Sequence, residues 1–141
     1  ADALQWQPPA PFDAILLDAP CSATGTIRRH PELPLIRDGA GVADLAALQA
    51  RLLDHALDLL RPGGRLVFAT CSLLAAEGED QLAAALARHP GLTVERPGLP
   101  GVAPEWITPQ GGLRLRPDHW PELGGMDGFF IACLRKPGGA T

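Results

Sequence analysis

The sequence predicts an α/β fold in which a mostly parallel sheet is flanked by helices. Two short, nearly continuous apolar runs, residues 12–18 and 65–70, have the composition of strands buried on both faces. Between them, leucines recur at helical spacing over residues 42–60, and Arg61-Pro-Gly-Gly64 ends that helix. A strand, a helix and a second strand in succession are typical of a parallel sheet with crossover helices.

The rest of the chain continues the alternation. A second helix begins with acidic residues at Glu77 and closes with basic residues at Arg88, an arrangement that suits the helix dipole. Residues 92–96 are a predicted third strand and residues 128–135 a last one. The stretch between them, residues 97–112, is rich in glycine and proline and is predicted to be a loop.

Composition restricts the classes of function. Hydrophobic residues are 46% and charged residues 20% of the 141, which is a globular composition. No apolar run reaches the ~18 residues of a membrane span, and no leader pattern is present, so we expect a cytoplasmic monomer with no membrane partner. The net charge of −4 argues against a free-standing nucleic-acid binder. The three cysteines are too far apart for a disulfide scaffold or a zinc site, and we expect no metal.

Two of the cysteines directly follow predicted strands. Cys21 follows the first strand in Pro-Cys-Ser, and Cys71 follows the second in Thr-Cys-Ser. Because ligands of α/β sheets bind at the carboxyl ends of the strands, the two cysteines are in positions that can face one pocket from neighbouring strands. Such a pair can act as two acid–base groups, as a redox pair, or as a nucleophile with a helper. Cys133 lies inside an apolar run and is expected to be a small core residue.

Three segments resemble motifs of one enzyme family. Asp18-Ala-Pro-Cys-Ser-Ala-Thr-Gly25, followed by Arg28-Arg-His-Pro-Glu32, resembles motif IV of the Sun/Nop family of RNA (cytosine-5) methyltransferases. Ala69-Thr-Cys-Ser-Leu73, with Glu77 and Glu79 shortly after, resembles motif VI of that family. Gly125-Met-Asp-Gly-Phe-Phe-Ile-Ala-Cys-Leu-Arg-Lys136 resembles its closing motif. The three segments stand in the family's order and span nearly the whole chain.

The resemblance implies a Rossmann-like, S-adenosylmethionine-dependent methyltransferase domain, of which this chain is the C-terminal half. Residues 1–136 are then the C-terminal part of one catalytic domain and residues 137–141 a tail. The expected substrate is a cytosine of RNA, with 16S ribosomal RNA favoured. The alternatives are a transfer RNA cytosine-5 methyltransferase of the same family and a non-catalytic interaction module. No Gly-x-Gly-x-x-Gly turn occurs in this sequence, so we expect the chain alone to be inactive.

The family's chemistry implies separate roles for the two cysteines. A thiolate adds to carbon 6 of cytosine, which makes carbon 5 nucleophilic toward the sulfonium methyl group, and a base then removes the carbon 5 proton. DNA cytosine-5 methyltransferases place their nucleophile in Pro-Cys, which favours Cys21. The RNA family uses the Thr-Cys-Ser cysteine instead. The resemblance therefore implies that Cys71 is the nucleophile and that Cys21 assists product release.

The resemblance also implies binding residues. Asp18, at the tip of the first strand, is expected to hydrogen-bond the cofactor or the cytosine ring, and Asp2 matches an acidic residue that contacts the cofactor's adenine. Arg28, Arg29 and His30 form a compact basic patch that can pair with RNA phosphates.

Two other enzyme classes fit less well. An amino-group methyltransferase ends the corresponding strand in Asp/Asn-Pro-Pro followed by an aromatic residue, and Asp18-Ala-Pro-Cys21 lacks that aromatic residue. A thiol hydrolase or redox protein needs a paired histidine or a second cysteine close by, and the sequence places neither convincingly.

Overall fold

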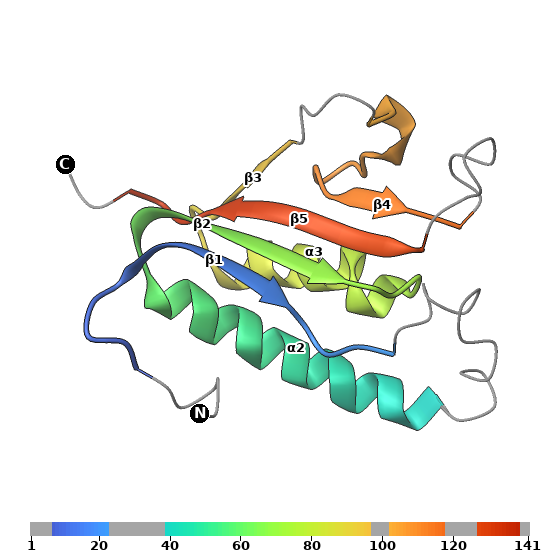
Figure 1. The fold of residues 1–141 in the computed structure, drawn as a ribbon, viewed down its shortest axis with the longest axis horizontal. Helices are drawn as coiled ribbons and strands as arrows, with labels where there is room; N and C mark the ends of the chain where they lie inside the picture. The colour runs from blue at the N-terminus through green and yellow to red at the C-terminus, as the bar shows by residue number, and fades with distance from the viewer. Residues whose placement is uncertain (1–6, 23–38, 97–101, 118–126, 139–141) are drawn as a thin grey trace.

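The structure is a computed structural model that describes residues 7–22, 39–96, 102–117 and 127–138. The described strands belong to one sheet, in the order β1-β2-β5-β3, with β4 also paired to β5 (Figure 1). In chain order the elements are β1 (Phe12–Asp18), α2 (Gly39–Leu59), β2 (Leu60–Thr70), the 3₁₀ turn η2 (Ala75–Glu77), α3 (Glu79–Arg88), β3 (Thr93–Glu95), the 3₁₀ turn η3 (Pro104–Trp106), β4 (Leu113–Leu115) and β5 (Phe129–Arg135).

The strand directions correct the prediction of a mostly parallel sheet. β1 and β2 pair in parallel, but β5 runs antiparallel to β2, β3 and β4. The two connections that contain helices, from β1 to β2 and from β2 to β3, do keep those three strands pointing the same way, as crossover units require. β5 inserts in reverse between β2 and β3 (Figure 1). The α/β class therefore holds, but among the described strands only the β1–β2 pair is parallel.

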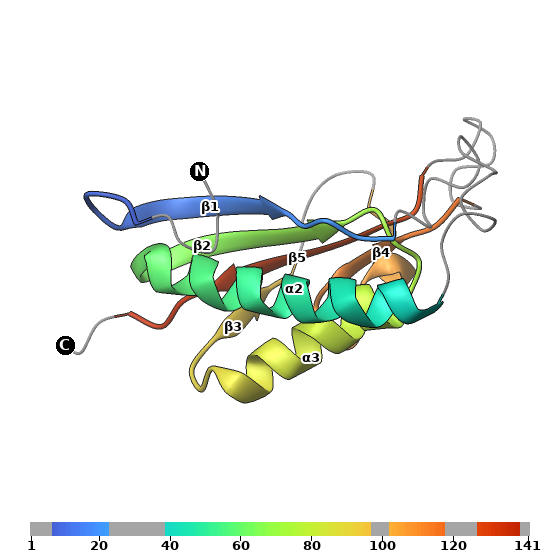
Figure 2. The same cartoon turned by 90° about the horizontal axis from the view of Figure 1, so that it is seen from below.

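One face of the sheet carries the hydrophobic core. Both α2 and α3 lie on that face (Figure 2). Alternate residues of β2 and β5 point toward the helices, because successive side chains of a strand face opposite sides. The buried apolar side chains on these four elements include Leu53, Leu57, Leu66, Phe68, Leu82, Phe130, Ala132 and Leu134.

The first strand is less buried than its apolar sequence predicts. Leu16 is 72% exposed, and β1 has no fully buried residue. The reason is its position: β1 lies at the end of the described sheet order, and the described helices cover only one face. Within the described ranges, no helix is both long enough and apolar enough to cross a membrane.

Two element boundaries differ from the sequence expectation. β2 begins at Leu60, before the Pro-Gly-Gly segment, and its pairing with β1 is irregular between Phe12 and Ala14. Glu77 belongs to the turn η2 rather than to the helix that follows it. The predicted loop at 97–112 contains η3, which buries Trp106, and β4 follows it.

Candidate active site

The two strand-end cysteines face each other. Cys21 Sγ and Cys71 Sγ are 3.5 Å apart, although the residues are 50 positions apart in the chain. The parallel pairing of β1 and β2 produces this approach, because Asp18 lies opposite Ala69 and the Ala19 amide donates to the Ala69 carbonyl at 3.0 Å. Both strands therefore end at the same level. Both cysteines are half-buried.

A buried carboxylate, that of Glu77, lies next to the two Cys-Ser turns, and this residue is 0% exposed. Glu77 Oε2 accepts from the Ser22 amide at 2.9 Å, and Oε1 accepts from the hydroxyls of Ser22 at 2.5 Å and Ser72 at 2.7 Å. Ser22 and Ser72 are the residues that directly follow the two cysteines. One side chain therefore bonds to both Cys-Ser turns.

The electrostatics of Glu77 favour its charged form. Burial raises the pKa of this carboxyl, but the hydrogen bonds from Ser22, Ser72 and Gln49 outweigh burial and leave the pKa below its usual value. A carboxylate accepts hydrogen bonds only, and each of these partners has a proton to give. Glu77 is therefore ionised at neutral pH and fully occupied as an acceptor.

Two glutamines extend the network into the helices. Gln49 Nε2, from α2, donates to Glu77 Oε2 at 2.9 Å and to the carbonyl of Pro20 at 2.8 Å. Gln81 Nε2, from α3, donates to Gln49 Oε1 at 3.3 Å and to the Ala46 carbonyl at 2.6 Å. Among the described residues, every buried side-chain nitrogen and oxygen has a hydrogen-bond partner. The network is thus satisfied, which is the condition for buried polar groups to stabilise a fold.

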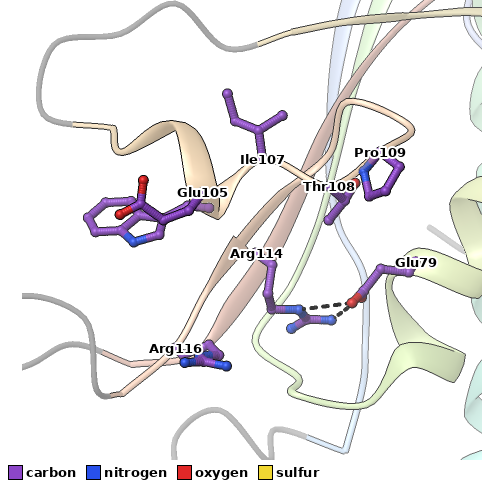
Figure 3. Close-up of a pocket in the computed structure, with 8 residues that line it drawn as sticks. Glu79, Glu105, Ile107, Thr108, Pro109, Arg114 and Arg116 are labelled. Carbon is purple, nitrogen blue, oxygen red and sulfur yellow. Dashed lines mark hydrogen bonds and ion pairs between the residues drawn. The ribbon is translucent and has the colours of Figure 1, made fainter.

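An arginine from β4 holds the Cys71 turn from the other side. Arg114 donates to the Ser72 carbonyl, pairs with Glu79, and lies over the ring of Phe130 at 5.3 Å. Beside it is a cavity of about 400 Å³ between α3, η3 and β4. Figure 3 shows Arg114 paired with Glu79 in the lining of this cavity, to which Arg116 also contributes. Arg114 therefore links the lining of the cavity to Ser72, the residue after Cys71. Its lining residues are Glu79, Glu105, Trp106, Ile107, Thr108, Pro109, Arg114 and Arg116.

The structure describes some of the other predicted site residues. Asp18 is exposed at the carboxyl end of β1, on the same side of the sheet edge as the cysteines. Asp2, Arg28, Arg29 and His30 lie outside the described residues. Over the described ranges, no group of three or more His, Cys, Asp or Glu side chains is arranged to hold a metal ion.

The third cysteine is separate from the pair. Cys133 is half-buried in β5, and its thiol donates to Glu95 at 3.7 Å. Burial and the neighbouring Glu95 carboxylate raise the pKa of the Cys133 thiol, which disfavours the reactive thiolate. Cys133 is not one of the core residues, because in β5 it alternates with the buried Ala132 and Leu134 and so lies on the opposite face of the sheet. The sequence expectation of a core residue was therefore wrong.

Sequence reasoning missed the network around Glu77. Glu77 was expected to be a helix-opening charge, and Gln49 is one polar position on an otherwise leucine-rich helix. The sequence does show that Glu77 follows Ser72 by five positions. It does not show that the same carboxylate also bonds to Ser22. A polar residue on the apolar side of α2, as Gln49 is, was a second available signal.

Comparison with known proteins places the chain in context. The family described as 16S rRNA methyltransferase RsmB/F matches residues 2–135. The ribosomal RNA small subunit methyltransferase B of Salmonella newport (strain SL254) is 46% identical over 132 residues. That alignment covers 94% of this chain and 28% of the relative, so the chain spans less than a third of the length of that curated relative.

Solved structures give the same fold. A structure described as NSun6 from Pyrococcus horikoshii with SFG has a TM-score of 0.78 and 30% identity, and the match covers 96% of this chain and 33% of that one. A methyltransferase homolog protein from the same organism has a TM-score of 0.68 and 33% identity over 90% of this chain and 40% of that one. The inserted antiparallel strand therefore belongs to a Rossmann-like methyltransferase sheet.

Proposed function

Because the chain belongs to the RsmB/F family of 16S rRNA methyltransferases, we propose that it carries the catalytic cysteines of an enzyme that methylates carbon 5 of a cytosine in RNA. The observation that carries the proposal is the Cys21–Cys71 pair, with its two sulfurs 3.5 Å apart at the ends of adjacent parallel strands. The names of the curated relatives favour small-subunit ribosomal RNA as the substrate. We assign methyl transfer to the whole protein and expect this chain alone to be inactive.

The paired thiols suit a reaction with two separate sulfur steps. In the first, the Cys71 thiolate adds to carbon 6 of cytosine, and the electron pair of the C5=C6 bond moves to carbon 5. S-adenosylmethionine, when bound, supplies the electrophilic methyl group for that carbon. In the second, a base takes the carbon 5 proton, the C5=C6 bond re-forms, and the C6–S bond breaks with its electrons returning to Cys71. Cys21 lies close enough to Cys71 to assist this release.

Asp18 is the described residue that fits a cofactor or base contact. Its carboxylate is exposed at the strand end, so it is free to accept hydrogen bonds from a ribose, an amine or a ring N–H. The proposed cofactor contact of Asp2, and the proposed phosphate contacts of Arg28, Arg29 and His30, remain predictions from the sequence.

Trapping of the covalent intermediate tests the cysteine assignment. In the full-length enzyme, Cys21→Ala is expected to accumulate a protein–RNA adduct that survives denaturing electrophoresis, because addition proceeds and release is blocked. Cys71→Ala is expected to form no adduct. Cys133→Ala is the matched control and is expected to methylate and release RNA like the wild type. An adduct in Cys71→Ala and none in Cys21→Ala would reverse the two roles.

The RNA substrate is tested separately. We expect methyl incorporation into small-subunit ribosomal RNA transcripts and none into transfer RNA. Incorporation into transfer RNA alone would overturn the ribosomal assignment while leaving the cysteine chemistry intact. No incorporation into any RNA and no adduct would favour the non-catalytic interaction module.

A further inference from the structure

We propose that Glu77 is a positioning residue that sets the distance between the thiols of Cys21 and Cys71. The inference rests on the proposed function, because that function gives the thiol spacing its importance. It goes beyond the cysteine assignment, because it locates the control of their spacing in a side chain that bonds to the serine after each cysteine.

On the Cys21 side, the residues before and after the cysteine are both held. Ser22 gives its amide and its hydroxyl to Glu77, and its side chain is 1% exposed. The Pro20 carbonyl accepts from Gln49, which also donates to Glu77. The residues on both sides of Cys21 are therefore connected to the Glu77 carboxylate, Ser22 directly and Pro20 through Gln49.

The Cys71 side has the same arrangement. The Thr70 hydroxyl donates to the main-chain carbonyl of Glu77 at 3.0 Å, and the Ser72 hydroxyl donates to the Glu77 carboxylate. Both side chains are 0% exposed. Ser72 Oγ also accepts from the Leu74 amide at 3.0 Å, which closes the turn. Glu77 therefore holds the residues on both sides of Cys71.

The carboxylate suits this task because of how its two oxygens are used. Oε2 accepts from two N–H groups, those of Ser22 and Gln49, which can only donate. Oε1 accepts from two hydroxyls, those of Ser22 and Ser72, which can either donate or accept. A glutamine can reproduce this pattern, with its oxygen at the Oε2 position and its amide nitrogen facing the hydroxyls. An alanine leaves all four groups without a shared acceptor.

Thiol cross-linking of the isolated chain measures the spacing directly. Diamide takes one hydrogen from each of two thiols and is reduced to the corresponding hydrazine, so that the sulfurs join. The rate of Cys21–Cys71 disulfide formation is followed by peptide mass spectrometry, which separates it from any product of Cys133. Glu77→Ala is expected to slow this rate by about tenfold or more, since small displacements of reacting atoms cost large factors in rate. Glu77→Gln is expected to react at close to the wild-type rate.

The control separates positioning from stability. Leu57→Ala removes a buried side chain near the far end of α2 and lowers stability without touching either Cys-Ser turn. Each variant is measured well below its own unfolding transition. Leu57→Ala is expected to cross-link like the wild type. Equal rates in folded Glu77→Ala and wild type would overturn the proposal, and so would a Glu77→Gln rate as slow as that of Glu77→Ala.

A second variant covers a failure of Glu77→Ala to fold. Ser72→Ala removes one donor from Glu77 and is expected to slow cross-linking, whereas an unchanged rate would overturn the proposal. Cross-linking requires neither RNA nor a methyl donor. If the cross-linking rate depends on Glu77 as expected but the full-length enzyme does not methylate RNA, the proposed function is rejected and the positioning role is kept. If the enzyme methylates RNA but the cross-linking rate does not depend on Glu77, the positioning role is rejected and the proposed function is kept.

Discussion

Glu77 is a charged side chain in a place where charge is costly. An ionised carboxylate with no exposed surface is tolerated only when its hydrogen bonds replace those of water. Two Ser22 donors, Ser72 and Gln49 provide that replacement. The consequence is a pH-dependent contribution to folding, because the unfolded chain hydrates the carboxyl normally.

We expect Glu77 to stabilise the fold at neutral pH and to lose that effect in acid. Its pKa is lowered on folding from an ordinary value of 4.5, so the unfolded chain binds the proton more readily. The contribution is therefore complete above that value and disappears as the pH falls through the lower folded pKa. Urea unfolding of wild type and Glu77→Gln, at pH 7 and at about pH 3, measures it.

The difference in unfolding free energy between the two proteins is the informative quantity. Asp54 and Glu95 also have lowered pKa values, but both are present in each protein and cancel in the difference. We expect the wild type to have the larger free energy of unfolding at pH 7, and we expect the difference from Glu77→Gln to become smaller in acid. An advantage that is equal at both pH values would show that the charge of Glu77 contributes nothing to stability.

Among the secondary-structure elements, α2 has an unusual C-terminal cap. Lys136, the one lysine of the sequence, donates from Nζ to the main-chain carbonyls of Leu57 at 2.8 Å and Leu60 at 2.9 Å. Leu57 lies in the last turn of the helix and Leu60 directly follows the helix. Carbonyls at a helix C-terminus have no partner within the helix, and the dipole there favours a cation. The segment after β5 thereby fastens the junction between α2 and β2.

We expect Lys136→Met to lower the free energy of unfolding by about 1–2 kcal/mol, because it removes a charged donor from two carbonyls and keeps the aliphatic stem. Chemical denaturation with circular dichroism at the helix signal gives the value. Arg135→Met is the matched control, since Arg135 is exposed and pairs at the surface with Glu95, and it is expected to change stability little. Equal losses in the two variants would argue against the cap.

The elements that the sequence predicted well are those with a local signal. Apolar runs and leucine spacing gave β1, α2, β2, α3 and β5 to within a few residues, apart from the early start of β2, because periodicity is a property of neighbouring positions. The reversed insertion of β5 between β2 and β3 was not predictable in this way. Strand order depends on pairing between distant segments, and no single segment records it.

The residues of the candidate site also differ in whether a local sequence signal reveals them. The cysteines were found because reactive residues directly after strands are recognisable in sequence. Glu77 and Gln49 were not, because their importance arises from contacts across 55 and 29 positions, with Ser22 and Pro20 respectively. The resemblance to motif VI includes Glu77 but assigns it no role, and its local sequence is that of an acidic residue that favours a helix start.

For the molecule as a whole, the two faces of the sheet are unequal. Both described helices cover one face of the sheet, and that face is buried (Figure 2). The opposite face carries half-buried apolar residues of β2 and β5 and the exposed Leu16, which pairs with Val67 of β2. β1 also lies at one end of the described strand order. In the isolated chain, an apolar strand in that position is a template for pairing with other copies.

We expect Leu16→Lys to raise the solubility of the isolated chain without lowering its melting temperature. Leu16 is 72% exposed, so little packing is lost, and a lysine on an outer strand opposes edge-to-edge association. Leu66→Lys is the contrasting control, because Leu66 is 0% exposed and its replacement is expected to unfold the chain. Solubility limits and thermal melts of the three proteins provide the test, and unchanged solubility in Leu16→Lys would contradict it.

The hydrogen bond from the Ser22 amide to Glu77 has a kinetic consequence. Ser22 belongs to no strand or helix, and amides outside such elements normally exchange with solvent rapidly. Separation of the turn after β1 from the segment after β2 that carries Glu77 breaks this hydrogen bond and releases the amide. We expect its deuterium exchange to be as slow as that of Phe68 in β2, and to become fast in Glu77→Ala. Rapid exchange in the wild type would show that the two turns separate on their own. Slow exchange would mean that the thiol pair comes apart only when the core itself opens.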